Sequence, residues 1–260
     1  MIRSLWISKT GLESQQFNVD TIANNLANVT TNGFKRQVPV FADLLYATLR
    51  QPGAQTTQLT QYPTGMQVGS GAAPVATVRI FTEGALEHTG NSLDLAINGK
   101  GFFQILLPDG TLAYTRDGSF QLDSNGQIVT SSGYQLQPTI SVPQDATSIT
   151  IGTDGTVSVT TPNSPNATQI GNIQLADFIN PAGLQSEGNN LYVETSASGP
   201  PTVNDPGTNG LGTLDQGYVE ISNVSATEEL VDLITAQRAF EINSRAVRTS
   251  DEMLARLAQL

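Results

Sequence analysis

The chain has 260 residues, of which 13% are charged, and it carries a formal net charge of −11. This length is enough for one large domain or two medium ones with a hydrophobic core. The absence of cysteine excludes disulfides, thiolate metal sites and thiol nucleophiles, and a lone histidine, His88, excludes a His-rich metal centre. We therefore expect no metal and no other cofactor.

Charge is distributed unevenly along the chain. Residues 117–237 hold 13 Asp and Glu and no Lys or Arg, whereas the segments on either side are nearly neutral. A region without cations cannot neutralise phosphates, so nucleic acid is not expected as its partner. Such a stretch most simply provides a solubilising outer surface.

Apolar runs are short throughout the chain. None approaches the roughly 18 to 20 residues of a membrane span, so no membrane insertion is expected. Near the amino terminus the apolar run is Leu5, Trp6 and Ile7. This is shorter than the roughly 7 to 15 residues of a signal-peptide core, so no cleaved secretory signal is expected.

The first 35 residues have the pattern of a helix. Leu5, Leu12, Val19 and Leu26 recur every seven residues, which predicts a helix with a narrow apolar stripe. The pair at residues 32–33, Asn-Gly, is typical of a helix end. Residues 1–35 are therefore expected to form an amino-terminal helix that packs in a coiled coil.

The next segment, residues 36–74, is expected to contain a short helix and an irregular hairpin or linker. Its part from residue 50 onward is rich in Gln, Thr, Gly and Pro. Glycine tolerates positive-φ turns, so the glycines indicate an ordered hairpin, not a slack linker. We expect this hairpin to lie between subunits of an assembly, with contacts at Pro52, Gly53, Gly65 and Gly69.

Residues 75–216 have the pattern of a β-rich domain. Turn pairs such as Asp109-Gly110 and Asn125-Gly126 recur every seven or eight residues between β-rich segments. This spacing favours an antiparallel meander, a small barrel or a sandwich over a βαβ fold. Surface loops are expected at 160–166 and 196–212. Strands are expected at residues 101–107, 112–116, 119–122, 127–130, 134–137, 148–151, 156–160, 172–178 and 190–194.

Residues 217–260 contain the clearest helical pattern. Ten positions from Ala226 to Ala258 alternate in steps of four and three, which is a coiled-coil seam. Gln237, Ser244 and Asp251 make this seam partly polar, so it needs added partners. The predicted fold class is α+β: terminal α-helices form a coiled-coil assembly domain and flank a central, mainly antiparallel β-domain. Two paired helices leave faces uncovered, so stacking on further copies would complete them.

Signatures of catalysis and metal binding are weak. The segment 123–126 resembles part of a calcium loop, but Gln121 and Ser132 stand where acidic ligands are needed. The glycines around Ser70 and Lys100 lack the spacing of a phosphate loop. His88 lies in a polar segment without a nucleophile to activate. We expect no catalytic, cofactor or metal site and no enzymatic activity.

Four asparagines cluster at the end of the first helix: Asn24, Asn25, Asn28 and Asn32. Each costs about 0.6 kcal/mol relative to alanine inside a helix. Their amides can satisfy the last helical carbonyls or hydrogen-bond a neighbouring chain. An end cap needs one or two asparagines, so a specific packing role is favoured.

Several separated segments resemble the bacterial flagellar rod and hook proteins. The amino-terminal signature of that family is similar to residues 23–35, and its β-domain is similar at 94–103 and 114–120. Its carboxyl-terminal signature is similar to residues 217–224, 228–231 and 237–244. The chain length and residues 43–55 and 63–69 most resemble the distal rod members. Hook members are longer, and proximal rod members lack much of the segment 50–70.

The resemblance implies a structural subunit that polymerises helically into a rigid hollow drive shaft. Such a shaft transmits torque from motor to hook and conducts exported subunits. The implied partners are further copies of the chain, other rod proteins, the hook protein and the flagellar export apparatus. The implied location is the basal body, across the periplasm toward the outer membrane, after export without a cleaved signal. We further expect the acidic segment 117–237 to face the surrounding P- and L-ring proteins.

Two alternatives stay open at this point: a proximal rod or hook protein of the same family, and a free-standing β-rich binding or adhesive module. The module predicts an exposed aromatic cluster, but the one tryptophan, Trp6, lies in the first helix. The residues expected to pack between subunits through the helices are Leu5, Leu12, Val19, Asn24, Asn25, Leu26, Asn28, Gly33, Phe34, Leu230, Leu233, Gln237, Phe240, Asn243, Val247 and Leu254.

Overall fold

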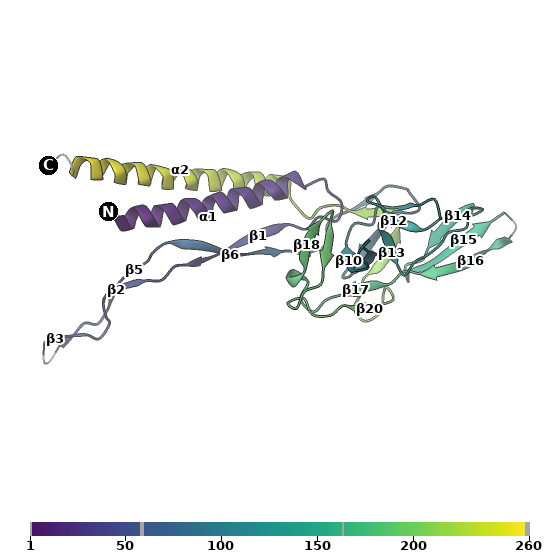
Figure 1. The fold of residues 1–260 in the computed structure, drawn as a ribbon, viewed down its shortest axis with the longest axis horizontal. Helices are drawn as coiled ribbons and strands as arrows, with labels where there is room; N and C mark the ends of the chain where they lie inside the picture. Colours follow the sequence, from purple (N-terminus) through teal and green to yellow (C-terminus); the bar gives the residue numbers. More distant parts are fainter. Residues whose placement is uncertain (1, 58–59, 163, 258–260) are drawn as a thin grey trace. The chain divides into compact units, whose positions relative to one another are not determined.

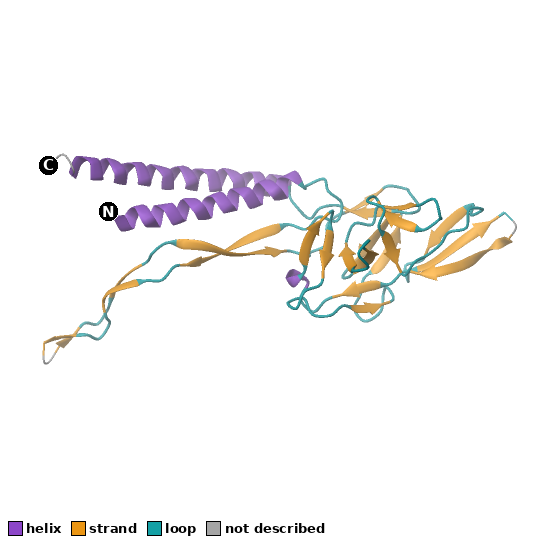
Figure 2. Cartoon of the chain, viewed as in Figure 1, coloured by secondary structure: helices purple, strands orange, loops and turns teal. Residues whose placement is uncertain are grey.

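A computed structural model describes residues 2–57, 60–162 and 164–257. The chain forms two compact units (Figures 1 and 2). The helical unit comprises Met1–Leu26, Gln37–Val78 and Ser225–Leu260, and the β-rich unit comprises Ala27–Arg36 and Arg79–Val224. Terminal helices with central antiparallel strands confirm the predicted α+β class.

The helical unit is built on two long helices. Helix α1 spans Ile2–Ala27 and helix α2 spans Ala226–Leu257, and they lie side by side in opposite directions (Figure 1). The close approach has a local reason at Gly11, where an added Cβ would lie 3.1 Å from Nδ2 of Asn243. Helix α1 ends at Ala27, about five residues before the expected Asn-Gly pair, and turns follow it.

The rest of the helical unit is a long two-stranded ribbon. Strand β1 (Gln37–Asp43) pairs with β6 (Ala72–Arg79), β2 (Ala47–Arg50) pairs with β5 (Met66–Val68), and β3 (Gln55–Thr57) pairs with β4 (Thr60–Gln61). The prediction of a short helix within 36–74 is wrong, because the described part of that segment contains these strands and the turns between them.

The β-rich unit is centred on a nine-stranded sheet. Its main path runs β11-β12-β13-β9-β10-β19-β18, with β17 pairing both β9 and β20. The strands are β9 (Phe102–Leu106), β10 (Leu112–Thr115), β11 (Phe120–Leu122), β12 (Ile128–Thr130), β13 (Gln135–Gln137), β17 (Leu175–Asp177), β18 (Gln185–Gly188), β19 (Leu191–Val193) and β20 (Thr202–Asn204). All these pairings are antiparallel, as the regular turn pairs predicted.

Smaller antiparallel groups complete this unit. A three-stranded sheet contains β14 (Ser148–Ile151), β15 (Thr156–Thr161) and β16 (Ser164–Asn172). Strand β8 (Leu95–Asn98) pairs with β21 (Thr213–Gln216), and β7 (Leu86–His88) pairs with β22 (Tyr218–Glu220). A single 3-10 turn lies at Pro181–Gly183.

The predictions of surface loops at 160–166 and 196–212 are wrong in part. Strands β15 and β16 extend into the segment 160–166, and β20 lies inside the segment 196–212. The expected strand at 172–178 is divided, since β16 ends at Asn172 and β17 begins at Leu175. In the two segments predicted as loops, polar strand residues such as Thr160, Thr161 and Thr202 have the composition of a loop.

The core of the β-rich unit is made of inward-facing strand residues. Its largest fully buried members include Leu95, Ile97, Phe103, Ile105 and Phe120. A second, aromatic cluster joins Phe102, Tyr114, Phe178 and Tyr192 with Phe81 in edge-to-face contacts. The two clusters lie on opposite faces of β9, because Phe102 and Phe103 are neighbours in one strand.

Candidate functional site

Helix α1 packs on its own chain through small polar residues. Thr10, Ser14, Thr21 and Asn25 are buried, and they define what we call the polar stripe. The Ser14 hydroxyl donates to the carbonyl of Ala72 at 3.2 Å. Thr10 lies directly under Gly71, where a Cβ would overlap its Oγ1. The polar stripe therefore faces the ribbon.

Asn25 makes the most extensive contacts of the asparagine cluster. Its Nδ2 donates to the carbonyl of Gln37 at 2.8 Å, and its Oδ1 accepts from the Gln37 amide at 2.9 Å. The same Nδ2 lies 3.3 Å from Oε2 of Glu229 on α2. Asn28 accepts from the Thr31 hydroxyl at 3.2 Å, and Asn24 is exposed. Asn25 thus joins both helices to the start of β1.

The apolar residues of the predicted seam are not part of the polar stripe. On α1, Leu5, Leu12, Val19 and Leu26 are each half-buried. On α2, Leu233, Asn243, Val247 and Leu254 are half-buried, whereas Leu230, Gln237 and Phe240 are exposed. The fully buried residues of α2 are instead Glu229, Ala236 and Ser250. Small and polar groups make two contacts between the helices of one chain, Gly11 with Asn243 and Asn25 with Glu229.

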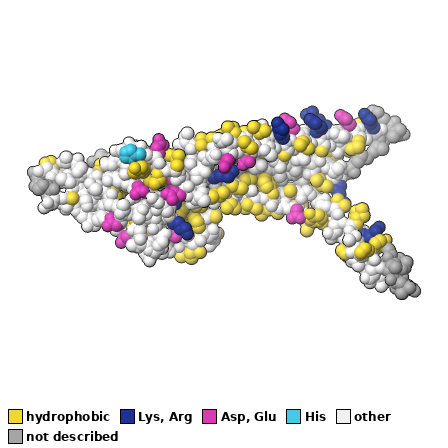
Figure 3. Space-filling model, turned by 180° about the vertical axis from the view of Figure 1, so that it is seen from behind, with side chains coloured by type: hydrophobic (Ala, Val, Ile, Leu, Met, Phe, Trp, Pro, Cys, Tyr) yellow, Lys and Arg dark blue, Asp and Glu magenta, His cyan; other side chains and the backbone are white. Residues whose placement is uncertain are grey.

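Large hydrophobic side chains are exposed on the helical unit. On α2 the exposed fractions are 47% for Leu230, 58% for Val231, 52% for Ile234 and 67% for Ile242. Figure 3 shows hydrophobic side chains reaching the surface over the helices and the ribbon. We call Leu230, Val231, Ile234 and Ile242 the α2 apolar patch. Patches of this kind on a soluble protein mark sites of association.

The ribbon also exposes apolar residues, with Leu45 89%, Leu49 58% and Met66 53% exposed. A two-stranded ribbon is marginally stable by itself, so it needs a further surface to pack on. Near its tip the Arg50 guanidinium lies 4.2 Å from the centre of the Tyr62 ring. This cation–π contact joins the two arms of the ribbon.

The four ribbon residues singled out by sequence have distinct surroundings. Gly53 has φ of 76° and donates to the carbonyl of Tyr62 at 3.0 Å. A Cβ on Gly65 would lie 2.7 Å from Cδ of Pro52, and a Cβ on Gly69 would lie 3.3 Å from the Tyr46 ring. Pro52, Gly53 and Gly65 are exposed, so all three are open to a neighbour.

Gly33 and Phe34, also expected to pack between subunits, are buried within the β-rich unit. Gly33 has φ of 68° and donates to the carbonyl of Glu220 at 2.7 Å. A Cβ at this position would lie 2.5 Å from the amide nitrogen of Asp117, so only glycine fits. Both residues anchor the segment after α1 to its own chain.

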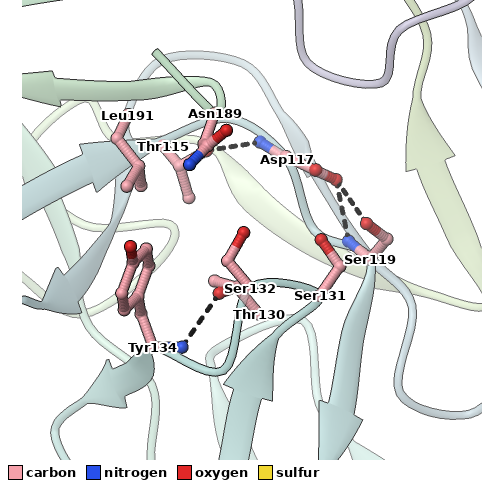
Figure 4. Close-up of a pocket in the computed structure, with 9 residues that line it drawn as sticks. All are labelled: Thr115, Asp117, Ser119, Thr130, Ser131, Ser132, Tyr134, Asn189 and Leu191. Atoms are coloured by element: carbon pink, nitrogen blue, oxygen red, sulfur yellow. Dashed lines mark hydrogen bonds between the residues drawn. The ribbon is translucent and has the colours of Figure 1, made fainter. Parts of the chain in front are cut away.

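A small polar pocket lies in the β-rich unit (Figure 4). The Asp117 carboxylate in it accepts from the Ser119 amide at 3.1 Å and the Ser119 hydroxyl at 2.7 Å. Burial raises the pKa of Asp117, against the effect of the Ser119 hydrogen bonds. The bonds from Ser119 to Asp117 are local turn contacts, and the lining contains no His, Lys or Arg. The lining is Thr115, Asp117, Ser119, Thr130, Ser131, Ser132, Tyr134, Asn189 and Leu191.

Other chemical groups are accounted for by structure. The His88 ring packs on Tyr218 with ring centres 4.8 Å apart. Within residues 2–57, 60–162 and 164–257, no group of three His, Cys, Asp or Glu side chains could hold a metal ion. None of the described helices is long and apolar enough to cross a membrane. The described helices and ribbon expose apolar surfaces suited to association.

Sequence reasoning missed the polar stripe, although the sequence carries a signal for it. Thr10, Ser14, Thr21 and Asn25 follow steps of four, seven and four, which place them on one helical face. A search for hydrophobic periodicity does not detect such a face, because its members are polar. Gly71, the residue that meets Thr10, is one of the two glycines beside Ser70.

Three models of protein families match the chain. The model described as flagella basal body rod protein matches residues 6–35. The model for the D1 domain of flagellar hook protein FlgE/F/G matches residues 96–159. The model for the carboxyl-terminal part of flagellar basal body rod FlgEFG proteins matches residues 215–260.

The chain is also similar over its full length to curated proteins. It is 56% identical to the flagellar basal-body rod protein FlgG of Buchnera aphidicola subsp. Schizaphis graminum over 260 residues, which is 100% of both chains. It is 51% identical to FlgG of Borreliella burgdorferi over 256 residues, covering 98% of this chain and 97% of the relative. It is 40% identical to FlgG of Bacillus subtilis over 266 residues, covering 100% and 99%.

Proposed function

The chain belongs to the FlgG family of flagellar basal-body rod proteins and is a structural, non-enzymatic subunit of the distal rod, and from that premise we propose how it assembles. Copies of the chain associate helically through α1, α2 and the ribbon into a rigid hollow shaft. This shaft transmits torque from motor to hook and conducts exported subunits through its centre.

The observation that carries this proposal is the exposed α2 apolar patch. Burying one Leu, Ile or Val side chain contributes about 1.5 to 3 kcal/mol. Leu230, Val231, Ile234 and Ile242 are each about half or more exposed in the single chain. The exposed apolar surface of these four residues is free of the chain's own groups and is available to neighbouring copies. A second copy offers the same kind of surface in return.

We assign the helical contacts between copies to the predicted seam. Its exposed or half-buried members are Leu5, Leu12, Val19, Asn24, Leu26, Asn28, Leu230, Leu233, Gln237, Phe240, Asn243, Val247 and Leu254. Asn25, Gly33 and Phe34 contribute by holding α1 and the segment after it in place. The ribbon adds a second contact around Pro52, Gly53, Gly65 and Gly69, which its exposed apolar residues support.

Membership of the family implies assembly with other rod and hook components. We propose that the rod formed by this chain joins other rod proteins at one end and the hook protein at the other. The rod spans the periplasm inside the P- and L-rings, and the flagellar export apparatus delivers its subunits without cleaving a signal. The acidic segment 117–237, which has no Lys or Arg, forms the surface that faces the rings.

Limited proteolysis with mass-spectrometric mapping tests the proposal on dilute monomer and on assembled polymer. We expect the monomer to lose roughly residues 1–26 and 225–260 while the β-rich unit, which includes residues 27–36, survives, because ends that pack on other copies are exposed before assembly. The polymer should protect both ends. Protection of both ends in the dilute monomer would contradict the proposal and favour a free-standing β-rich module on a helical stalk.

A further inference from the structure

Three charged side chains are buried inside the β-rich unit, away from the apolar surfaces described above. Lys35, Arg116 and Glu220 are 0%, 3% and 1% exposed. The Lys35 ammonium donates to Oε1 of Glu220 and, at 2.7 Å, to the carbonyl of Thr82. Nη1 of Arg116 lies 3.5 Å from Oε2 of Glu220. The backbone amide of Gly84 also donates to Oε1 of Glu220, at 2.8 Å.

This ion cluster is costly to build. Burial lowers the pKa of both Lys35 and Arg116, against the attraction of Glu220 and of Glu83 nearby. Asp177 adds to the attraction on Arg116. Within the described chain, Nε of Arg116 and Oε2 of Glu220 have no hydrogen-bond partner. Apolar residues of similar volume often replace such pairs without loss of stability, and the best-attested use of buried charge is to specify one arrangement.

The arrangement specified here joins three separate segments of the chain. The amide of Gly33 donates to the Glu220 carbonyl at 2.7 Å, and the amide of Arg36 donates to Oδ1 of Asn223 at 2.7 Å. Nδ2 of Asn223 donates to the carbonyl of Ile80 at 2.8 Å, and the Ile80 amide donates to the Arg36 carbonyl at 2.9 Å. The segments 33–36, 80–84 and 220–223 are thus bonded to one another.

These segments also lie at three of the four places where the chain passes between its units. The unit boundaries fall after Leu26, after Arg36, after Val78 and after Val224. The last three boundaries each lie within two residues of a member of the bonded group. Three of the four covalent connections between the units therefore begin at this group.

We propose that Lys35, Arg116, Glu220 and Asn223 form a clasp that fixes the three connecting segments to one another, and that the clasp sets the stiffness of the assembled polymer. The proposal rests on the proposed function. Its members are positioning residues, because they hold the connections and touch no partner themselves. Without the clasp the three connections move separately and the polymer twists and bends more easily.

The test compares Lys35→Met with the unsubstituted full-length chain. Glu220 keeps Arg116 and the Gly84 amide in this variant, so we expect the β-rich unit to stay folded, with a lower melting temperature because one partner of a buried ion pair is removed. Hydrogen exchange in 33–36, 80–84 and 220–223 should rise at least tenfold. The bending persistence length of the polymer in electron micrographs should fall at least threefold. Lys100→Met, at an exposed lysine of the same unit, is the matched control and should change neither quantity.

Asn223→Ala provides a second variant, since it opens the same group without leaving a buried charge, and it decides the question where Lys35→Met does not fold. Unchanged exchange and stiffness in the folded variants would overturn the proposal. So would a stiffness that falls only in proportion to the melting temperature, which is the mark of a merely structural role. A full-length chain that does not polymerise would contradict the proposed function, whereas the exchange measurements on monomer would still test the clasp.

Discussion

At the scale of single residues, polar side chains do much of the structural work in this chain. Asn25 has a low helix propensity, yet its side-chain amide makes two hydrogen bonds to the backbone of Gln37. Each such bond contributes roughly 1 kcal/mol net, and leaving the half-buried Gln37 backbone groups unsatisfied would cost more. The packing role expected for the asparagine cluster is visible here within one chain, and its role between chains stays a prediction.

Asp117 provides a prediction at the same scale. Burial raises the pKa of Asp117 in the folded state above its unfolded value of 3.8. Between the unfolded and the folded pKa, the folded state therefore binds more protons than the unfolded state. The free energy of unfolding therefore falls as the pH rises through this window, and the cost persists at pH 7. Asp117→Asn removes this cost and keeps an acceptor for Ser119. We expect its Tm to rise by about 2 °C at pH 7, with a smaller rise at pH 3.

Asp109→Asn is the matched control for that measurement. Hydrogen bonds from the hydroxyl and amide of Thr111 lower the pKa of Asp109 below 3.8. The ionised Asp109 therefore raises the free energy of unfolding above pH 3.8, and this stabilisation is lost as the pH falls through the lowered pKa. The Asp109 variant should not gain stability at pH 7. Equal shifts of Tm in both variants at every pH would contradict the assignment to burial.

At the scale of elements, the sequence was most informative where turns fix the strands. The turn pairs between residues 109 and 133 place β10 to β13 within about a residue of their observed ends, and Gly110, Gly126 and Gly133 adopt the positive φ that such turns need. The expected short helix in 36–74 is wrong, and Pro39 with its β-branched and aromatic neighbours gives a physical reason.

The helices show what periodicity leaves undetermined. An apolar stripe identifies a face that must be covered, and it does not say whether the cover comes from the same chain or from another. Here Leu5, Leu12, Val19 and Leu26 are half-buried, while the polar stripe meets the ribbon. The pairing of Ser14 with Ala72, 58 residues along the chain, depends on tertiary geometry that no local pattern encodes.

The ribbon provides a prediction at the element scale. A Cβ on Gly65 would lie 2.7 Å from the Pro52 ring and 2.9 Å from the Arg50 carbonyl, so Gly65→Val forces β5 away from β2 near the tip. We expect rod assembly or rod shape to change, as seen by electron microscopy. The melting temperature of the β-rich unit should stay the same, because the ribbon belongs to the other unit.

Thr64→Val is the control, because it places the same β-branched side chain at the adjacent, exposed position. It should leave the rods unchanged. A fall in the melting temperature of the β-rich unit in Gly65→Val would instead make Gly65 a part of the monomer core, and would remove the ribbon from the contacts between subunits.

At the scale of the whole molecule, the net charge of −11 arises from one region. Residues 117–237 contribute 13 acidic groups and no basic one, and most of this segment belongs to the β-rich unit. Exposed acidic residues there include Asp145, Asp154, Glu187 and Glu194. The exposed apolar residues of α2 and the ribbon belong instead to the helical unit. The chain thus separates a surface suited to association from one suited to avoiding it.

This separation predicts the effect of adding positive charge. Gln121, Ser124, Gln144 and Gln185 are exposed, and replacing all four with lysine makes the segment four units less negative. A like-charged surface resists sticking to a surrounding ring, and scattered lysines would add attractive contacts. We expect slower motor rotation and fewer completed rings in cells that carry this variant, while the melting temperature of the β-rich unit changes little. Four asparagines at the same positions serve as the neutral control. Normal rotation and ring assembly in the lysine variant would show that the acidic segment does not act as the surface facing the rings.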